Sequence, residues 1–326
     1  MAKSNQNKIN IFEVIKPGFL TTIQDLGRYG YQQYGVSVSG AMDSYSLRIA
    51  NILLGNDENF AGLEIHYGGI KLKALQSCYI AITGGDLNPM INQQPVTMWR
   101  TIKIEKGSIL TFEGNRQHKG SISYVAVQGG IISKMIMGSQ STFIKEGISQ
   151  FFGSKLEKGD FITSYHSPID IRFSRALNPL YIPQYKGDIK VRFIIGPHQH
   201  LFNKESLEKF QHESYQVLPQ SDRMGFRLNG LPLVQTVDHN IITDATPVGT
   251  IQVPQNGQPI ILLADRQPTG GYPKIGTVIS VDIPYISQLK PGDQVYFQEI
   301  SIEESQQLLI NQEKFFQELK IGTKKP

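Results

Sequence analysis

The heptapeptide Lys106-Gly107-Ser108-Ile109-Leu110-Thr111-Phe112 joins a tight turn to a short run of mostly apolar residues. Two similar segments follow, KGDFITS at 158–164 and PGDQVYF at 291–297. Glycine adopts turn conformations without steric cost, and the residues after each glycine partly alternate between apolar and polar. Each segment therefore predicts a turn that leads into a β-strand. Further short strands, each followed closely by glycine or proline, are indicated at 121–127, 189–195 and 260–263.

Signals for helices are few. Helices are predicted over 44–54, where Gly55-Asn56 ends the pattern, and over 204–211. Ser301-Ile302-Glu303-Glu304 fits a capping box, in which the serine oxygen and the glutamate carboxylate satisfy free backbone amides at a helix start. The apolar stripe of this C-terminal helix, which we expect to pack on its own domain, consists of Ile302, Leu308, Leu309, Phe315, Phe316 and Leu319. Many short strands with few helices predict a mainly β fold of barrels or sandwiches.

The chain has 326 residues, a length that suggests two domains because a typical domain has about 150. Between 166 and 188 the sequence contains Pro168, Pro179 and Pro183 and little apolar periodicity, which is typical of a linker. We therefore predict an N-terminal β-rich domain over 1–170 and a linker over 171–188. The C-terminal domain, with the C-terminal helix, is predicted over 189–326.

The composition excludes several classes of protein. Hydrophobic residues make up 40% of the chain, which is enough for an ordinary buried core and excludes disorder. The net charge of +4 is small and the basic residues are scattered, so nucleic-acid binding is not favoured. No apolar run reaches the roughly 18 residues of a membrane helix, and the polar stretch 1–10 lacks the apolar segment of a secretory signal. We therefore expect a cytoplasmic protein that does not bind membranes.

Cysteine and histidine give little support for a metal site. Cys78 is the single cysteine and lies in an apolar run, so a packed thiol is expected and an intrachain disulfide is excluded. His198 and His200 form an H-x-H pair, but without identified carboxylate or cysteine partners we interpret it as a polar loop and predict no metal. The sequence also lacks a P-loop, a G-x-G-x-x-G motif and an H-E-x-x-H motif.

Three segments, 17–43, 221–228 and 249–274, combine glycine with polar residues beside apolar runs. Glutamine and threonine can hydrogen-bond an amide, arginine and lysine can neutralise a carboxylate or phosphate, and glycine pairs let a ligand approach the backbone. The segment 249–274 therefore predicts a site for a small, planar, anionic ligand. An alternative is equally compatible with the composition: Gly270-Gly271 is only a hairpin turn, and Asp265 and Arg266 form a surface ion pair.

Eight short motifs run in order along nearly the whole chain, at 22–28 (TIQDLGR), 35–43, 62–64, 83–87, 138–142 (GSQST), 222–228, 249–254 and 265–273. Together they closely resemble the C-subunit family of 5-oxoprolinases, also described as KipA-like or allophanate-hydrolase-subunit-2-like proteins. That family is related to the carboxyltransferase part of urea amidolyase. Gly85 and Gln140 depart from the pattern, in which alanine and arginine are commoner, and the glutamine weakens an anion-binding role for its loop.

The resemblance implies a mainly β protein with two barrel-like domains, of which the C-terminal one is cyclophilin-like. It also implies one component of an ATP-dependent 5-oxoprolinase, which opens 5-oxoproline to glutamate and is inactive as a lone chain. The implied partners are a KipI-like subunit and a LamB/YcsF-type subunit. Because the chain lacks a P-loop, we expect ATP to be bound together with a partner.

For this function we expect the polar C-terminal segments to form the site, because an amide reacts only when preorganised groups stabilise the charge that develops on it. The catalytic candidates are Asp222, Arg223, Asp265 and Lys274. The substrate-binding candidates are Gln252, Pro254, Gln258, Gln267, Thr269, Gly270, Gly271 and Tyr272. The candidates for a composite site or a subunit contact are Gln24, Asp25, Arg28, Ser39, Asp43 and Glu64. For Asp222 the alternative role is a turn cap, and for Arg266 it is a surface ion pair.

Two other functions remain open. A KipA-like regulatory protein would bind and antagonise a kinase-inhibitor partner without catalysis. A biotin-dependent carboxyltransferase acting on urea or an amide would need a biotinylated partner, because this chain lacks the Met-Lys-Met sequence of a biotin acceptor. We therefore expect no biotin on this chain.

Overall fold

The computed structural model describes residues 8–115, 119–144, 152–165, 174–236 and 241–324. Their contacts divide the chain into two compact units. The first unit consists of Met1–Arg28, Ser39–Tyr185 and Phe316–Pro326, and the second consists of Tyr29–Val38 and Lys186–Phe315. Each unit therefore combines segments that lie far apart in the sequence.

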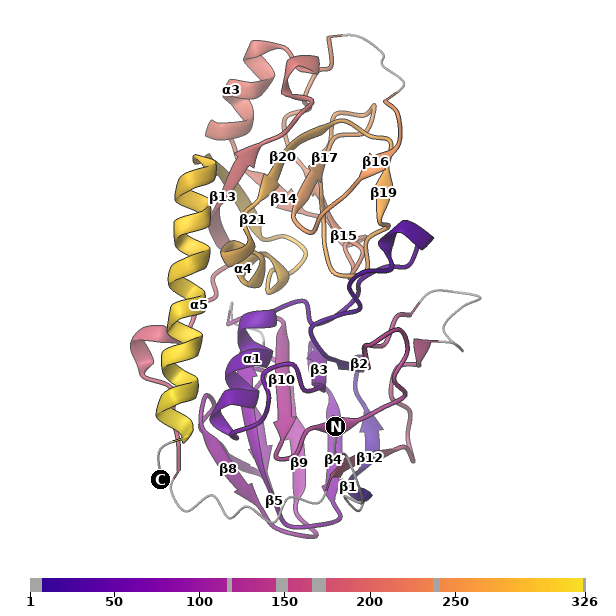
Figure 1. Ribbon diagram of the computed structural model, residues 1–326, viewed down its shortest axis with the longest axis vertical. Coiled ribbons are helices and arrows are strands. Elements are labelled where there is room, and N and C mark those ends of the chain that lie inside the picture. The colour runs from indigo at the N-terminus through magenta and orange to yellow at the C-terminus, as the bar shows by residue number, and fades with distance from the viewer. Residues whose placement is uncertain (1–7, 116–118, 145–151, 166–173, 237–240, 325–326) are drawn as a thin grey trace. The chain divides into compact units, whose positions relative to one another are not determined.

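The first unit contains two antiparallel β-sheets (Figure 1). The larger has seven strands in the order β11-β12-β1-β4-β9-β6-β7, and the smaller has five in the order β2-β3-β10-β5-β8. Helix α1 (Ser44–Leu53) packs on β5 and β10 of the smaller sheet. The strands are β1 (Lys8–Pro17), β2 (Leu20–Gln24), β3 (Gly62–His66), β4 (Ile70–Ala74), β5 (Cys78–Gly84), β6 (Pro89–Ile91), β7 (Gln94–Pro95), β8 (Thr101–Ile104), β9 (Ile109–Phe112), β10 (Ile122–Val127), β11 (Ile131–Ile132) and β12 (Phe161–Tyr165).

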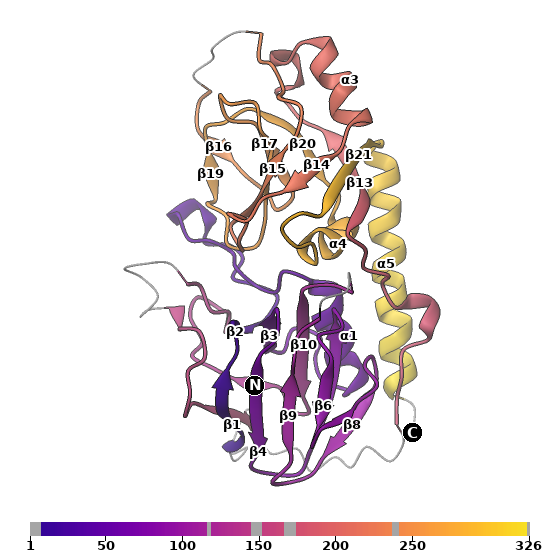
Figure 2. The ribbon, with the colours of Figure 1, turned by 180° about the vertical axis from the view of Figure 1, so that it is seen from behind.

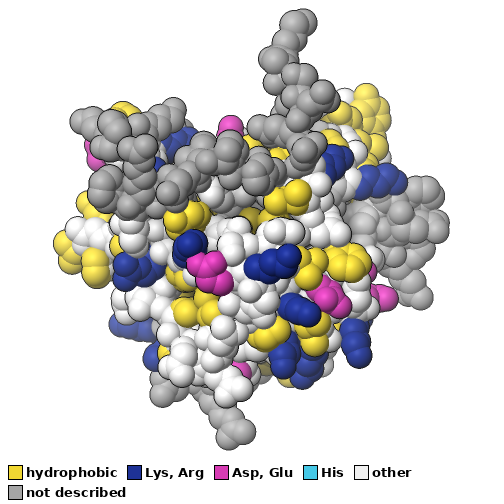
Figure 3. All heavy atoms as spheres, turned by 90° about the horizontal axis from the view of Figure 1, so that it is seen from below, with side chains coloured by type: hydrophobic (Ala, Val, Ile, Leu, Met, Phe, Trp, Pro, Cys, Tyr) yellow, Lys and Arg dark blue, Asp and Glu magenta, His cyan; other side chains and the backbone are white. Residues whose placement is uncertain are grey.

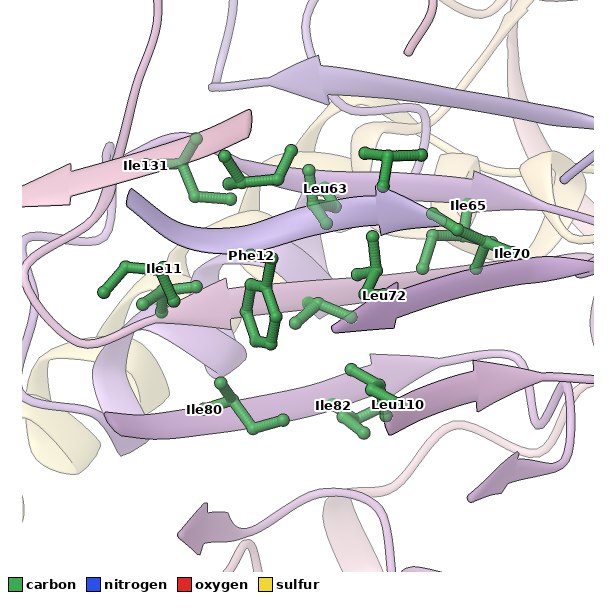
Figure 4. Close-up of a cluster of buried hydrophobic side chains, with 14 of the residues drawn as sticks. Ile11, Phe12, Leu63, Ile65, Ile70, Leu72, Ile80, Ile82, Leu110 and Ile131 are labelled. Carbon is green, nitrogen blue, oxygen red and sulfur yellow. The ribbon is translucent and has the colours of Figure 1, made fainter. Parts of the chain in front are cut away.

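Aliphatic side chains from both sheets form the core of the first unit (Figure 4). Strand β4 alternates between buried and exposed residues, with Lys71 and Lys73 exposed, because only one face of its sheet points to the core. Strand β3 is buried along its whole length. Phe12 and Leu63 at the centre of the cluster are fully buried, and large-to-small changes at such positions typically cost about 2–5 kcal/mol.

The second unit is built around a closed barrel of seven strands in the order β13-β20-β17-β18-β15-β14-β21 (Figure 2). Strands β13 and β21 pair in parallel, and β13 pairs with β20 in antiparallel fashion. Two further strands, β16 (Asp244–Ala245) and β19 (Thr269–Gly270), form a separate ribbon. The barrel strands are β13 (Asp188–Ile195), β14 (Tyr215–Val217), β15 (Gly225–Asn229), β17 (Thr250–Gln252), β18 (Ile260–Leu262), β20 (Lys274–Val278) and β21 (Gln294–Glu299).

Aromatic rings join helix α3 (Lys204–His212) to the barrel. Phe210 of α3 stacks on Phe297 of β21 with 4.3 Å between the ring centroids, and it meets Phe193 of β13 edge to face at 5.3 Å. All three rings are buried, as is Tyr215, which contacts both Phe210 and Phe297. Such aromatic pairs contribute about 0.5–1.5 kcal/mol each beyond the area that they bury. A short helix, α4 (Ile283–Ser287), precedes β21.

The mainly β fold class predicted from the sequence is confirmed, with a closed barrel in the C-terminal half. In the three turn–strand segments, Gly107, Gly159 and Gly292 have φ of 87°, 92° and 98° and lead into β9, β12 and β21. Such angles strain any residue with a side chain, so each turn requires glycine. This requirement is why the glycines predicted the turns correctly. The helices expected at 44–54 and 204–211 are α1 and α3.

The domain bounds and the cyclophilin-like character of the barrel stay predictions. In the linker predicted over 171–188, residues 171–173 lie outside the described part of the chain, and the rest contains a short 3₁₀ helix at Pro179–Tyr181. Cys78 is a partly buried thiol, and burial raises its pKa to about 12, as expected for a packed cysteine.

Helix α5 (Ile302–Lys324) begins where the capping box predicts, since the Oγ of Ser301 accepts the backbone N–H of Glu304 at 3.1 Å. Its packing differs from the expectation. Ile302 and Leu309 are 55% and 39% exposed, whereas Phe316 is fully buried and belongs to the first unit. The guanidinium of Arg48 lies 3.6 Å from the centroid of the Phe316 ring. The stripe therefore does not pack as a whole on the second unit.

The face of the molecule in Figure 3 carries Lys and Arg side chains interspersed with acidic and hydrophobic ones. On this face the basic residues do not gather into one area, in agreement with their scatter in the sequence. None of the helices in the described ranges combines the length and the apolar character that a bilayer crossing requires.

Candidate functional site

Strands β17 and β20 bring two of the predicted site residues together. Gln252 at the end of β17 pairs with Lys274 at the start of β20, next to an irregularity in the register. Directly opposed residues of antiparallel strands place their side chains on one face. The ribbon lies beside them, with Asp244 of β16 opposite Gly270 of β19. We call Asp244, Gln252, Gly270 and Lys274 the ribbon cluster.

Lys274 supplies the positive charge of the ribbon cluster. The residue is only 4% exposed, and its Nζ lies 3.3 Å from Oδ2 of Asp244. The Asp244 side chain is 67% exposed, and a hydrogen bond from the backbone of Ala245 together with Lys274 lowers its pKa. A buried ammonium needs a counter-charge, and here the counter-charge is a carboxylate at the surface. The charge of Lys274 is therefore balanced at the surface of the unit and not within its core.

Gln252 supplies an unused hydrogen-bond donor. The residue is 6% exposed, and its Nε2 is buried without a hydrogen-bond partner among the described residues. Buried amide groups in proteins are normally hydrogen-bonded, so this donor marks a place for an acceptor atom. A Cβ on Gly270 would lie 2.4 Å from this Nε2, so the amide packs directly on the glycine backbone. The close approach that the sequence suggested at Gly270 is thus made by Gln252.

His198 adjoins the ribbon cluster. Its Nδ1 accepts the backbone N–H of Lys274 at 3.2 Å. Burial, followed by the charge of Lys274, lowers the pKa of His198. Because Nδ1 accepts this hydrogen bond, the proton of the neutral ring is on Nε2. The described residues contain no group of three potential metal ligands. The H-x-H pair is not in a plain loop, because His198 precedes the short 3₁₀ helix Gln199–Leu201 and His200 lies within it.

Arg223 and Asp265, both predicted to be catalytic, bind each other. The guanidinium Nε and Nη2 donate to Oδ2 and Oδ1 of the carboxylate at 2.8 and 3.0 Å. The residues are 7% and 4% exposed, so the pair is buried. The two hydrogen bonds link the segment before β15 to the segment after β18, and each charge neutralises the other. Asp222 accepts the backbone N–H of Met224 at 2.7 Å, in agreement with the alternative of a turn cap.

Arg266 is not at the surface, contrary to the alternative prediction of a surface ion pair with Asp265. The residue is 9% exposed, and its Nε donates to the carbonyl of Thr246 at 2.7 Å. Burial lowers the pKa of its guanidinium, the largest effect on that group. The surface ion pair with Asp265 is therefore wrong. The hairpin turn at Gly270-Gly271 is also wrong, because Gly270 is part of strand β19.

The remaining substrate-binding candidates lie outside the ribbon cluster or at its edge. The side chain of Gln258 exchanges hydrogen bonds of 2.9 and 3.1 Å with the backbone of Gly230, so it fastens two loops. The carbonyl of Pro254 accepts the N–H of Gly257 in a turn. The exposed or partly exposed candidates are Gln267, Thr269, Gly271 and Tyr272.

A surface pocket of about 400 Å³ lies beside the end of β17, lined by Pro232, Leu233, Val234, Gln235, Gln255, Asn256 and Gly257. It includes none of the predicted site residues. The Nε2 of Gln235 donates to the carbonyl of Val253 at 3.1 Å, and Val253 is the residue that follows Gln252. One wall of the pocket, Gln255–Gly257, lies within the segment 249–274 that the sequence singled out, whereas the other wall, at 232–235, carries no distinctive pattern.

In the first unit, two of the motif segments hold each other. Asp25 accepts the hydroxyls of Ser139 and Ser141 at 2.7 and 2.5 Å and the backbone N–H of Gln140 at 2.6 Å. Arg28, which is 1% exposed, donates to the carbonyl of Ser141. The Nε2 of Gln24 donates to the carbonyl of the neighbouring Thr142. These candidates for a composite site therefore bind the 138–142 loop.

Asp43 and Glu64 belong to a second buried network of the first unit. Glu64 is fully buried and accepts the backbone N–H of Met42 at 2.9 Å and the hydroxyl of Tyr124 at 2.7 Å. Its other oxygen is 2.8 Å from Nε2 of His66. Asp43 caps α1, and burial together with these two carboxylates raises the pKa of Tyr124.

Ser39 differs from the other candidates of the first unit. It has a φ of 57°, which is unusual for a residue with a side chain, and it is 5% exposed. Its Oγ is buried without a hydrogen-bond partner among the described residues. It is the member of the composite-site set whose side chain is not used in a described network.

Comparison with known proteins shows similarity along most of the chain. The carboxyltransferase domain family (subdomains A and B) matches residues 34–299. A protein named as the C-subunit of 5-oxoprolinase from Escherichia coli (strain K12) is 36% identical over 95% of this chain and 97% of its own length. The protein of that name from Haemophilus influenzae is 34% identical over 88% of this chain and 90% of its own length. The crystal structure of the K. lactis urea amidolyase superimposes on this chain with a TM-score of 0.85, and the two sequences are 29% identical. The match covers 97% of this chain and 20% of the longer urea amidolyase chain.

Proposed function

The chain belongs to the carboxyltransferase domain family that comprises subdomains A and B. We propose that it is one component of an ATP-dependent 5-oxoprolinase. It helps to convert 5-oxoproline to glutamate with a KipI-like subunit and a LamB/YcsF-type subunit. The observation that carries the proposal is the 36% identity to the E. coli protein named as the C-subunit of 5-oxoprolinase, over 97% of that protein. Fold similarity alone does not identify a function, but here the match extends over nearly all of both chains.

The ribbon cluster is the part of this chain that we assign to the substrate. 5-Oxoproline carries a carboxylate and a lactam carbonyl on one small ring. The ammonium of Lys274 suits the carboxylate, and the unpartnered Nε2 of Gln252 donates a hydrogen bond to an acceptor oxygen. Opening the ring breaks the lactam C–N bond, adds the hydroxyl of water to the carbonyl carbon and leaves a proton on the nitrogen. A donor aimed at the oxygen that becomes negative contributes about 3–4 kcal/mol to such a step.

Arg223 and Asp265 have a positioning role in this proposal. Their two hydrogen bonds use both oxygens of the carboxylate, so Asp265 is not free to take a proton without losing its partner. The pair links the segment before β15 to the segment after β18, and these two strands pair with each other. Breaking a buried ion pair by removing one member typically costs about 3–5 kcal/mol, so substitutions here act through stability.

Among the described residues, those of the ribbon cluster do not form a phosphate-binding site for ATP. Lys274 starts a strand and not a helix, so the cluster lacks the row of backbone N–H groups with which a helix N-terminus binds phosphate. The residues of the ribbon cluster are therefore assigned to the substrate alone. We propose that the nucleotide is bound largely by a partner.

The proposal is tested by reconstitution of the three subunits and an assay of ATP-dependent loss of 5-oxoproline. We expect little activity from the lone chain and full activity from the complex. The variant Lys274→Met should lower kcat/KM by about 10²–10³-fold while the complex still forms, because a preorganised charge is lost. The exposed Lys190 of β13 gives a matched control, Lys190→Met, that should keep full activity.

Two outcomes would contradict this proposal in different ways. Absence of turnover in a complete, stable complex would reject the 5-oxoprolinase function and favour the KipA-like regulatory role. Full activity of Lys274→Met would keep the function but remove the ribbon cluster from the substrate site.

A carboxyltransferase that acts on urea or an amide is the second candidate, and the structural similarity to urea amidolyase favours it. An amide or urea substrate also presents a carbonyl oxygen, so the Gln252 donor would serve the same purpose. This reaction needs a carboxylated biotin carrier on a partner. Carboxylation of urea that depends on bicarbonate and on a biotinylated partner, without loss of 5-oxoproline, would establish this candidate in place of the first.

A further inference from the structure

Asp244 was not among the residues that the sequence pointed to, yet its carboxylate is the ion-pair partner of Lys274. The two groups differ in burial, since the Lys274 side chain is 5% exposed and the Asp244 side chain is 67% exposed. The separation of 3.3 Å is long for a charge-assisted hydrogen bond, for which about 2.7–2.9 Å is usual. An exposed carboxylate thus makes a loose contact with a buried ammonium.

The ribbon places this carboxylate close to the unused donor of Gln252. Asp244 is directly opposite Gly270 in the ribbon, and the backbone of Gly270 lies against the Nε2 of Gln252. Gln252 in turn is paired with Lys274 across β17 and β20. Ammonium, carboxylate and amide are therefore neighbours, but the carboxylate makes no hydrogen bond to the amide.

We propose that Asp244 occupies the position of a ligand carboxylate and is displaced from Lys274 when that ligand binds. The ligand carboxylate replaces Asp244 at Lys274, while a second oxygen-bearing group of the same ligand accepts from Gln252, which Asp244 does not do. The exchange keeps the ammonium neutralised and satisfies the buried amide, whose unmet hydrogen bond is costly. Asp244 itself moves into water, where its charge is well solvated.

The proposal makes Asp244 a residue that sets affinity and specificity. Its charge competes with every anion that approaches Lys274, so weak anions are excluded and a ligand that also uses Gln252 is favoured. A neutral lactam offers no carboxylate to replace Asp244 and should bind poorly. Only the choice of 5-oxoproline as the ligand rests on the proposed function; the exchange of carboxylates does not.

The alternative role for Asp244 is structural, in which it only neutralises the buried Lys274. The two roles predict opposite results for Asp244→Asn, which removes the charge and keeps the shape. Loss of a competing carboxylate strengthens anion binding, whereas loss of a necessary counter-charge destabilises the barrel and weakens the site.

The test uses the full-length protein labelled with ¹⁵N. The side-chain amide resonances of Gln252, assigned by their absence in Gln252→Leu, are followed during titration with 5-oxoproline, with glutarate as a simple dicarboxylate and with uncharged 2-pyrrolidinone. We expect Asp244→Asn to bind 5-oxoproline about two- to five-fold more tightly than the unchanged chain, the range expected for the loss of a weak ion pair whose carboxylate is exposed. Asp244→Asn combined with Lys274→Met should lose the binding, and the exposed Asp188 gives the control Asp188→Asn.

Each outcome decides a separate point. Weaker or unchanged carboxylate binding by a folded Asp244→Asn protein overturns the exchange. Tighter binding of 5-oxoproline without turnover in the reconstituted complex supports the exchange and rejects the 5-oxoprolinase function. Tighter binding of glutarate but not of 5-oxoproline supports the exchange and rejects 5-oxoproline as the ligand. Failure of both carboxylates to shift the Gln252 resonances overturns the exchange.

Discussion

Gly270 is a residue whose lack of a side chain shapes the ribbon cluster. Its backbone is not in the left-handed region, so conformational freedom is not the reason for glycine there. The reason is space, because a Cβ would meet the Nε2 of Gln252 at 2.4 Å and the Cγ2 of Thr246 at 3.2 Å. Both atoms belong to side chains that are buried, so neither can move away freely. A methyl group at this position must displace the Gln252 amide.

We therefore expect Gly270→Ala to lower kcat/KM of the reconstituted enzyme by at least about ten-fold, because a 1 Å displacement of a positioning group can cost up to about 10². Gly271→Ala is the matched control, since its Cβ would lie 3.5 Å from Oγ1 of Thr243, an ordinary contact. Steady-state kinetics and thermal unfolding of both variants provide the measurement. Equal activity of the two variants would show that the Gln252 amide does not act on the substrate.

The sequence could identify Gln252, Gly270 and Lys274 as candidates because their types suit an anionic amide ligand. It could not separate Lys274 from Arg223, which carries the same charge but is neutralised by Asp265. Asp244 was not predicted because it lies five residues before the segment 249–274, and a single aspartate there has no distinctive pattern. Its importance depends on a pairing between two-residue strands about 25 positions apart in sequence.

At the scale of elements, the loop after β2 and the 138–142 loop form one hydrogen-bonded structure centred on Asp25. Its carboxylate accepts from the side chains of Ser139 and Ser141 and from the backbone of Gln140 and Gly27. These four hydrogen bonds satisfy the acceptor oxygens of a buried carboxylate, which would otherwise be costly to bury. The turn–strand segments could be predicted from their own glycines. The packing of these two loops could not, because no local pattern shows that Asp25 and Ser139 are in contact.

Asp25→Asn should lower the free energy of unfolding of the first unit by about 1–3 kcal/mol, because an amide NH₂ group replaces an acceptor oxygen and leaves a buried donor unpaired. Trp99, the single tryptophan, lies in the first unit and is 5% exposed, so its fluorescence during urea unfolding reports on this unit. The control is Asp86→Asn, at a carboxylate that is 47% exposed and accepts the N–H of Asn88. Equal stability of the two variants would contradict a central role for Asp25.

At the scale of the whole molecule, each unit is completed by a short segment from elsewhere in the chain. Tyr29–Val38 belongs to the second unit, where the Oγ of Ser37 donates to the carbonyl of Arg266 at 2.9 Å. Phe316–Pro326 belongs to the first unit. Sequence patterns placed both segments with their neighbours in the chain, because hydrophobic periodicity shows that a face is buried but not which partner buries it.

Phe316 is the residue through which the end of α5 stabilises the first unit. Its ring is fully buried against Arg48 and Tyr45 of α1, and Lys320 forms an ion pair with Glu58 one turn later. Phe316→Ala should therefore lower the stability of the first unit by about 3–5 kcal/mol, the usual cost of removing a buried phenylalanine ring. Urea unfolding followed by Trp99 fluorescence measures the change.

Ile310→Ala on the same helix is the control for this prediction. Ile310 is 48% exposed, so its truncation should change stability by less than about 0.5 kcal/mol. Both changes place alanine, a strong helix former, in α5, so a loss of helix propensity does not explain a difference between them. If Phe316→Ala and Ile310→Ala had the same midpoint of urea unfolding by Trp99 fluorescence, the end of α5 would contribute nothing to the stability of the first unit. A lower midpoint for Phe316→Ala alone would show that the core of this unit includes a residue far beyond Tyr185, the end of its central segment.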